Sequence, residues 1–189
     1  MHRPLGAVLV GGASCRMGRD KAGLRWEGRT LASRAAGLLR GLCDPVVLSG
    51  GPHGDLPDLR PRQGPLAGLE AALAAAQGRD VFLLACDLPA VDRALVRRIL
   101  DRPDSFGHDA AEARVAVDEE GLQPLCALYS STCAPLVRNS LDRGERAARD
   151  LLAVLRVTAV EAGGQLVNLN TPDDWARWTA GSAGEHPAS

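Results

Sequence analysis

The chain has 189 residues, of which 46% are hydrophobic, and its formal net charge at pH 7 is −1. This length can bury a proper core, and we expect a single domain over residues 1–180. A charge near zero and only six aromatic residues (three Trp, two Phe and one Tyr) argue against a nucleic-acid-binding module and against membrane attachment through charge.

Cysteine and histidine usage also narrows the class of protein. Five cysteines without a C-x-x-C pair and four scattered histidines argue against a disulfide framework and against a zinc site. The apolar run Leu5–Val10 is too short for a signal peptide or a membrane span. We therefore expect a cytoplasmic protein with reduced core cysteines, in which Cys15 is the candidate for an exposed thiol.

In the first half of the chain, apolar runs typical of strands alternate with helical periodicity. The expected strands cover residues 5–10, 45–49 and 81–86, and the expected helices follow Thr30, Gly64 and Asp92. A polar loop over 52–63 separates the second strand from the second helix. The uninterrupted apolar run at 81–86 is typical of a central strand covered on both faces.

The second half changes character. The pattern predicts a hairpin of 113–118 and 122–129, helices at 133–142 and 145–154, strands at 155–161 and 166–169, and a helix at 172–179 capped by Thr171. Residues 181–189 are small and polar, and we expect a disordered tail there. Together these elements predict an α/β fold with a mixed, mostly parallel sheet between helix layers.

The glycine-rich stretch 11–21 is the first candidate site. Its glycines allow backbone N–H groups to converge on an anion, while Arg16, Arg19 and Lys21 add positive charge. Lys21 is the only lysine in the chain, which suggests that its compact ammonium has a chemical role. An ordinary glycine-rich surface turn is the alternative. The spacing fits neither a P-loop nor a dinucleotide fingerprint, so we interpret the stretch as a triphosphate-binding loop rather than part of a dehydrogenase.

Asp87 is the second candidate, because it directly follows the apolar strand 81–86. Ligands in such sheets bind outside the carboxyl ends of the strands, where this carboxylate is expected. A helix N-cap or a structural ion pair is the alternative. A single carboxylate suffices for Mg²⁺ bound to a triphosphate, since water and phosphate oxygens complete its coordination.

The sequence Leu9-Val10-Gly11-Gly12-x-Ser14-x-Arg16-Met17-Gly18-x-Asp20-Lys21 resembles the signature of the MobA-like nucleotidyltransferases, with Val10 where alanine is usual. Three further motifs resemble family segments: Gly64-Pro65-Leu66-Ala67-Gly68, Gln123-Pro124-Leu125-Cys126-Ala127-Leu128-Tyr129 and Asn168-x-Asn170-Thr171-Pro172-x-Asp174. A capped helix start is the alternative explanation of the last. The resemblance implies a three-layer Rossmann-like nucleotidyltransferase fold.

The resemblance also implies roles for individual residues. It implies a GTP site made of Leu9, Val10, Gly11, Gly12, Lys21, Ser49, Asp58, Pro65, Leu66 and Asp87, and catalytic roles for Arg16, Lys21 and Asp87. Asp87 would hold Mg²⁺, while Arg146, Asn168 and Asn170 would contact molybdopterin, with Arg149 as an alternative to Arg146.

Asp58 matches the acid of guanine-specific members, and a carboxylate can accept from the N1–H and N2 amine that only guanine presents together. A solvated loop acid is the alternative. Arg62-Gln63 stands where we expect a glycine-containing turn.

The implied reaction transfers GMP from GTP to molybdenum-molybdopterin and releases pyrophosphate, with molybdoenzymes or their chaperones as candidate partners. Alternatives remain: CTP as the nucleotide, another phosphorylated acceptor such as a sugar phosphate or phospholactate, or a nucleotide-binding protein without turnover. Cytidylyltransferase relatives usually show L-A-A-G at Leu9–Gly12 and Asp at 168 and 170, so this chain favours guanine. Lys21 and Asp87 together argue against a protein that only binds.

Overall fold

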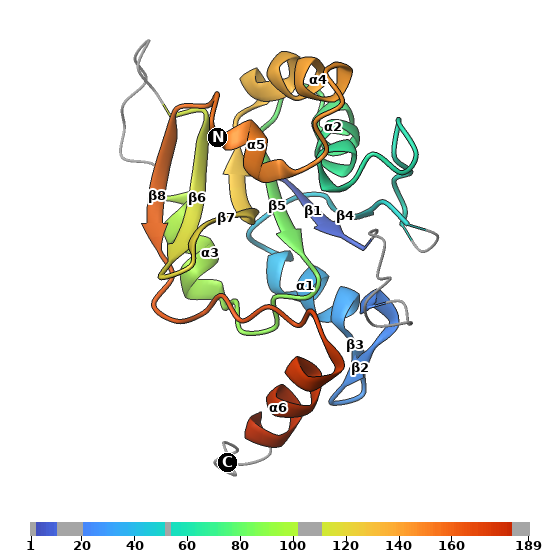
Figure 1. Ribbon diagram of the computed structural model, residues 1–189, viewed down its shortest axis with the longest axis vertical. Coiled ribbons are helices and arrows are strands. Elements are labelled where there is room, and N and C mark those ends of the chain that lie inside the picture. Colours follow the sequence, from blue (N-terminus) through green and yellow to red (C-terminus); the bar gives the residue numbers. More distant parts are fainter. Residues whose placement is uncertain (1–2, 11–20, 52–53, 102–110, 183–189) are drawn as a thin grey trace.

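The computed structural model describes residues 3–10, 21–51, 54–101 and 111–182. These residues form one six-stranded sheet, a small two-stranded hairpin and the helices around the sheet (Figure 1). The strand order is β4-β1-β5-β7-β6-β8. The strands are β1 (Leu5–Leu9), β4 (Val46–Ser49), β5 (Val81–Ala85), β6 (Ala113–Asp118), β7 (Gly121–Tyr129) and β8 (Val157–Glu161). Strand β7 runs antiparallel to both neighbours and the other pairs are parallel, which confirms a mixed, mostly parallel sheet.

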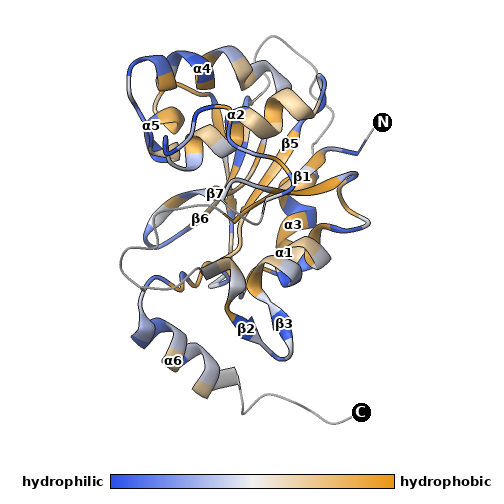
Figure 2. Ribbon diagram, turned by 90° about the vertical axis from the view of Figure 1, so that its right-hand side faces the viewer, coloured by the Kyte–Doolittle hydropathy of each residue, from blue (hydrophilic) through white to orange (hydrophobic). Residues whose placement is uncertain are grey.

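Helices cover both faces of this sheet. On one face, α1 (Leu31–Leu39) and α3 (Arg93–Leu100) pack against Val8, Phe82 and Leu84. On the other face, α2 (Pro65–Ala75), α4 (Ala134–Asp142) and α5 (Ala148–Leu152) pack against Leu5, Leu83 and Ala127. The central strands are hydrophobic on both faces, as Figure 2 shows for β1 and β5, because each face is buried by a helix layer. The three-layer α/β prediction is confirmed.

Local signals set the starts of α1 and α3 as the sequence predicts. The Thr30 side chain accepts a hydrogen bond from the Ser33 amide, and the Asp92 carboxylate accepts one from the Leu95 amide. Helix α1 ends at Leu39, earlier than its apolar pattern suggests. Gly41, which follows the cap residue Arg40, has a φ of +82° that ends the helix, and Arg93 donates to the Leu38 and Arg40 carbonyls at that end.

The predictions for the second half need three corrections. Residues 166–169 form no strand, because their backbone lies beyond the sheet and the Leu169 amide donates to the Asp87 carbonyl instead. Helix α5 is limited to Ala148–Leu152 and β8 begins at Val157, so both are shorter than expected. Helix α6 (Pro172–Ser182) includes the first two residues of the expected tail, and residues 183–189 lie outside the described part.

The Gln123–Tyr129 motif has a structural explanation. The β6–β7 register shifts between Val115 and Ala116, which pair with Ala127 and Gln123 respectively. The buried Tyr129 hydroxyl donates to the Pro124 carbonyl at 2.8 Å across this irregularity. The motif therefore shapes β7 around the bulge.

The four cysteines that the structure describes, at 43, 86, 126 and 133, are free and buried, and Cys15 lies outside the described residues. Burial raises the pKa of the Cys43, Cys126 and Cys133 thiols to about 12, so these three are unreactive. Among the residues placed by the structure, no helix has the length and hydrophobicity required to cross a bilayer.

Candidate nucleotide and acceptor site

The carboxyl ends of β4, β1 and β5 lie side by side at one edge of the sheet. Leu9 is in register with Ser49 on one side and with Ala85 on the other. The pairing continues past the strands, since the Val10 amide donates to the Ser49 carbonyl and the Cys86 amide to the Leu9 carbonyl. This edge therefore brings Leu9 and Val10, which directly precede the glycine-rich stretch, beside Cys86, the residue before Asp87.

Part of the expected triphosphate site is outside the structural description. Gly11, Gly12 and Arg16 fall in the undescribed residues 11–20. Lys21 begins the short 3-10 helix η1 (Lys21–Gly23), but its side chain is not described. The following residue, Ala22, is buried in the core beside α1, which anchors the end of this stretch.

Three residues expected at the nucleotide are buried here. Leu9 packs toward α2 and Val10 toward α1, so the substitution of valine for the family's alanine places its extra methyl groups in the core. Ser49 is fully buried, and its hydroxyl donates to the Gly68 carbonyl at 3.1 Å. A nucleotide contact through Ser49 remains a prediction, and its burial favours a role in positioning β4 against α2.

Gly68 lies where α2 packs closely against the end of β1. A Cβ added there would lie 2.5 Å from Leu9 Cδ2, 3.5 Å from Ser49 Oγ and 3.7 Å from Asp58 Oδ1. Only glycine fits without moving Leu9, because real Cβ atoms do not approach another heavy atom so closely. The last glycine of the Gly64–Gly68 motif therefore sets the depth at which α2 packs.

Asp58 carries an unsatisfied carboxylate oxygen beside this contact. Its Oδ1 atom is buried and has no hydrogen-bond partner among the residues described. Desolvation by burial raises the pKa of Asp58 above its ordinary value. A half-buried acceptor without a donor is costly unless a ligand supplies the donor, so the structure favours a binding role over a solvated loop acid.

The N-terminus of α2 links the nucleotide motif to the acceptor-side segment. The Leu66 amide donates to the Arg146 carbonyl at 3.4 Å, and the Leu66 side chain is fully buried. Gly64 has a φ of +72°, and a Cβ there would lie 2.9 Å from the Arg146 carbonyl oxygen. Glycine at 64 is thus required twice, by its backbone conformation and by the approach of Arg146. Pro65 occupies the first turn of the helix.

Arg62 has a left-handed backbone conformation at the place where we expect a glycine-containing turn. Its φ is +61°, in the left-handed region that favours glycine. The loop consequently turns before Gly64 without a glycine of its own. The cost is local backbone strain of about 1 kcal/mol.

Asp87 lies half-buried just after β5, and its carbonyl accepts from the Leu169 amide at 3.0 Å. Asn168 and Asn170 flank that amide, so the structure brings them beside Asp87 although they do not form a strand. The rest of the motif caps α6. The Asp174 carboxylate accepts from the Asn170 and Thr171 amides, while Thr171 Oγ1 accepts from the Asp174 amide.

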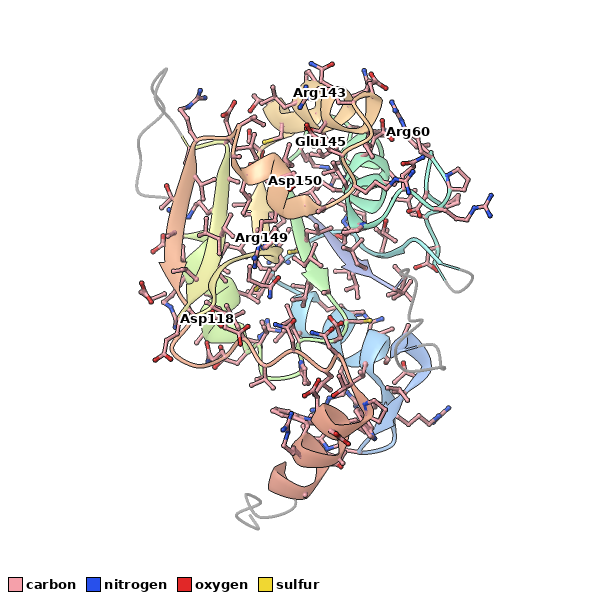
Figure 3. All side chains as sticks on the ribbon, viewed as in Figure 1. Arg60, Asp118, Arg143, Glu145, Arg149 and Asp150 are labelled. Atoms are coloured by element: carbon pink, nitrogen blue, oxygen red, sulfur yellow. The ribbon has the colours of Figure 1, made fainter. Side chains whose placement is uncertain are left out.

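The two arginines expected at the acceptor phosphate are both exposed. Arg146 precedes α5 and Arg149 lies in it, and Figure 3 shows Arg149 below α5 near the middle of the molecule. Within the described residues, neither guanidinium forms a hydrogen bond or ion pair to another side chain. Unpaired exposed cations suit an anionic ligand such as a phosphate.

No sequence pattern points to Arg60, which lies two residues after Asp58. Its Nη1 atom binds Asp142 Oδ1 at 2.6 Å and its Nε atom lies 3.2 Å from Glu70 Oε2. Figure 3 shows it at the side of the molecule where α2 lies beside α4. The signal in the sequence is Glu70, a charged residue in a helix whose neighbours are apolar.

Solved structures with the same fold define the class of protein. The molybdopterin-guanine dinucleotide biosynthesis protein A of Archaeoglobus fulgidus superposes with a TM-score of 0.73 at 20% identity, covering 96% of this chain and 100% of that one. The 2-C-methyl-D-erythritol 4-phosphate cytidylyltransferase of Thermus thermophilus superposes with a TM-score of 0.69 at 18% identity, covering 97% of this chain and 100% of that one. The chain thus has the fold of nucleotidyltransferases.

Sequence comparison narrows this class. Residues 6–161 match the MobA-like NTP transferase domain, and the chain belongs to that family. The molybdenum cofactor guanylyltransferase of Xanthomonas euvesicatoria pv. vesicatoria (strain 85-10) is 33% identical over 193 aligned residues, which cover 94% of this chain and 95% of that protein. The enzyme of the same name from Pseudomonas syringae pv. syringae (strain B728a) is 34% identical over 180 residues, which cover 87% of this chain and 88% of that protein.

Proposed function

We propose that the protein is a molybdenum cofactor guanylyltransferase that transfers GMP from GTP to the terminal phosphate of molybdenum-molybdopterin and releases pyrophosphate. The observation that carries this proposal is the Asp58 carboxylate, buried without a donor beside α2 at the carboxyl edge of the sheet. Guanine is the base that offers two adjacent donors, N1–H and the N2 amine, to one carboxylate. Relatives of this name align over most of the chain.

The chemistry requires little proton transfer. The attacking phosphate is already anionic, so the main barrier is repulsion between it and the triphosphate, and the protein must neutralise and align the two. We assign Arg16, Lys21 and the amides of Gly11 and Gly12 to the leaving pyrophosphate. We assign Arg146, an exposed cation whose carbonyl accepts from the Leu66 amide, to the acceptor phosphate, and Asn168 and Asn170, which flank the Leu169 amide bound to the Asp87 carbonyl, to the pterin.

Asp87 fits a magnesium ligand by chemistry and position. Its carboxylate is a hard oxygen donor at the edge where we propose that the triphosphate binds, and it is half-buried rather than exposed. No cluster of three metal-ligating side chains occurs within the described ranges, so a cation there would take its remaining ligands from water and phosphate. When bound, Mg²⁺ would supply charge neutralisation between the phosphates.

A cytoplasmic location and hand-over of the product to molybdoenzymes or their chaperones belong to the same proposal. The free, buried cysteines of the described residues support a reducing compartment.

Calorimetry with GTP, CTP, ATP and UTP in the presence of Mg²⁺ tests the nucleotide assignment. We expect GTP to bind at least about 10-fold more tightly than the others, and Asp58→Ala to weaken GTP binding by about 10- to 100-fold, the cost of losing hydrogen bonds to a charged group. Binding of ATP should change little in this variant. A preference for CTP would replace the proposal with a cytidylyltransferase, and no binding of any triphosphate would overturn it.

A further inference from the structure

We propose that Arg60 is a positioning residue that sets guanine selectivity by holding the loop that carries Asp58 against α2 and α4. The inference rests on the proposed role of Asp58 as the guanine-reading carboxylate. Arg60 itself faces the two helices rather than the nucleotide edge.

The loop is held firmly on the side that precedes Asp58. The Leu56 amide donates to the Leu48 carbonyl, and the Leu56 carbonyl accepts from the Gly50 amide, so Leu56 pairs with the end of β4. The Asp55 carboxylate also accepts from the Leu48 amide at 3.1 Å. These bonds fix the chain up to Leu56, two residues before Asp58.

On the other side of Asp58, the contacts of Arg60 replace this backbone pairing. The guanidinium donates to Asp142 at the end of α4 at 2.6 Å, and its Nε atom lies 3.2 Å from Glu70 Oε2 on α2, an ion pair in which that oxygen has no hydrogen bond from the described residues. The Glu70 side chain is 8% exposed and the Asp142 side chain 58%, so Arg60 contacts a buried carboxylate on α2 and an exposed one at the end of α4. A planar guanidinium can hold two carboxylates in a fixed direction, which an ammonium on a flexible stem cannot.

The position of Asp58 between these two anchors decides its orientation. Residues 57–63 have no strand or helix, and Leu59 is 60% exposed, so packing of its side chain does not hold the loop. The buried Asp58 Oδ1 depends on the loop remaining against Gly68. Without Arg60, we expect the carboxylate to turn toward water and to lose its alignment with the base.

The decisive variants separate positioning from charge compensation. Arg60→Ala leaves Glu70 buried without its partner, which by itself destabilises a protein. The double variant Arg60→Ala/Glu70→Gln removes that buried charge as well as the arginine that contacts both helices. A matched control is Arg156→Ala/Glu112→Gln, which removes another ion pair between an arginine and a mostly buried glutamate. The two side chains lie 3.4 Å apart, the Glu112 side chain is 14% exposed, and the pair lies just before β6 and β8, at the side of the sheet away from β4.

The experiment measures dissociation constants for GTP, ITP and ATP by calorimetry with Mg²⁺, since ITP lacks only the N2 amine. For the double variant we expect GTP affinity to fall by about 10-fold and ATP affinity to change by less than about twofold, with ITP less affected than GTP. Arg60→Lys should recover only part of the loss. The control pair should keep the wild-type ratios.

Different results identify which claim fails. Wild-type ratios in Arg60→Ala/Glu70→Gln, with selectivity still lost in Asp58→Ala, would overturn the role of Arg60 and leave the proposed function standing. An equal loss for all three nucleotides would also overturn it, because it would show general damage to the site. No guanine preference in the wild-type protein would instead contradict the proposed function itself.

Discussion

The two sides of the candidate site are built differently. The nucleotide side is formed by ends of parallel strands and by α2, with Leu9, Ser49 and Leu66 buried and Gly68 packed to the limit of contact. The acceptor side is formed by irregular backbone around Asn168 and by exposed arginines before and within α5. One side is set by core packing and the other by a few exposed polar contacts.

This difference indicates how each side tolerates change. Substitutions on the nucleotide side should reduce stability and binding together, because the same contacts serve both. Substitutions on the acceptor side should alter binding of the second substrate while the fold is retained. Asp87 lies between them, after β5 and hydrogen-bonded through its backbone to Leu169.

The largest effect is expected at Asp87, where the two sides meet. Asp87→Ala should lower the rate of pyrophosphate release by about 1000-fold or more while the far-UV circular dichroism stays unchanged, because charge neutralisation at the phosphates is lost. Asp101→Ala, which removes an exposed carboxylate at the end of α3, is the control and should keep full activity. Turnover of Asp87→Ala near wild type with added Mg²⁺ would contradict the assignment.

A glycine pair compares a packed position with an open one. Gly68→Ala should lower the free energy of unfolding by up to about 2 kcal/mol and weaken GTP binding, because the new Cβ displaces the buried Leu9 side chain and this cost is only partly offset by the higher helix propensity of alanine. Gly37→Ala in α1 meets nothing within 4 Å and should raise stability by about 0.5–1 kcal/mol. Urea unfolding measures both, and equal effects would contradict the packing difference.

On the acceptor side, Arg146→Gln should raise the KM for molybdenum-molybdopterin by about 10-fold and leave the Kd for GTP within about twofold. Its backbone carbonyl, which accepts from the Leu66 amide, is retained in this variant. Arg138→Gln, an exposed arginine of α4, serves as the comparison and should leave both constants unchanged. Loss of GTP affinity in Arg146→Gln would show that the two sides are not separable in this way.

The smallest effect concerns the cap of α6. Hydrogen bonds from the Thr171 side chain and amide, together with Arg177 and the Asn170 amide, lower the pKa of Asp174 from 3.8 to about 2. A lowered folded-state pKa gives stability that is present above the unfolded value and lost as pH falls from 3.8 toward 2. The difference in unfolding free energy between wild type and Asp174→Asn should therefore shrink over that range. A difference that stays constant there would contradict the cap.

Much of the fold follows from local sequence signals. Thr30 and Asp92 cap helices where the sequence places them, and the apolar run from Val81 identifies a central strand. Such features depend on neighbouring residues, so they can be read without knowing the tertiary structure. The strand expected over residues 166–169 fails because strand formation needs a free sheet edge, which this segment does not reach.

The candidate site divides in the same way. Asp58 is recognisable through the resemblance to guanine-specific members of the family, and Asp87 because it directly follows an apolar strand, whose end the sheet then brings beside that of β1. The pairing of Arg60 with Asp142 joins residues 82 positions apart and depends on how α2 packs against α4. No local pattern contains that information, although Glu70 in a buried helix signals that some cation must lie nearby.

The central claim is that a guanine nucleotide is joined to molybdopterin. The most direct test incubates the protein and Mg²⁺ with an equal mixture of GTP, CTP, ATP and UTP and with molybdenum-molybdopterin, and identifies the dinucleotide formed by mass spectrometry. We expect the guanine dinucleotide as the main product, absent with Asp87→Ala and strongly reduced with Asp58→Ala. A cytosine dinucleotide as the main product, or no pterin dinucleotide from any nucleotide, would contradict it.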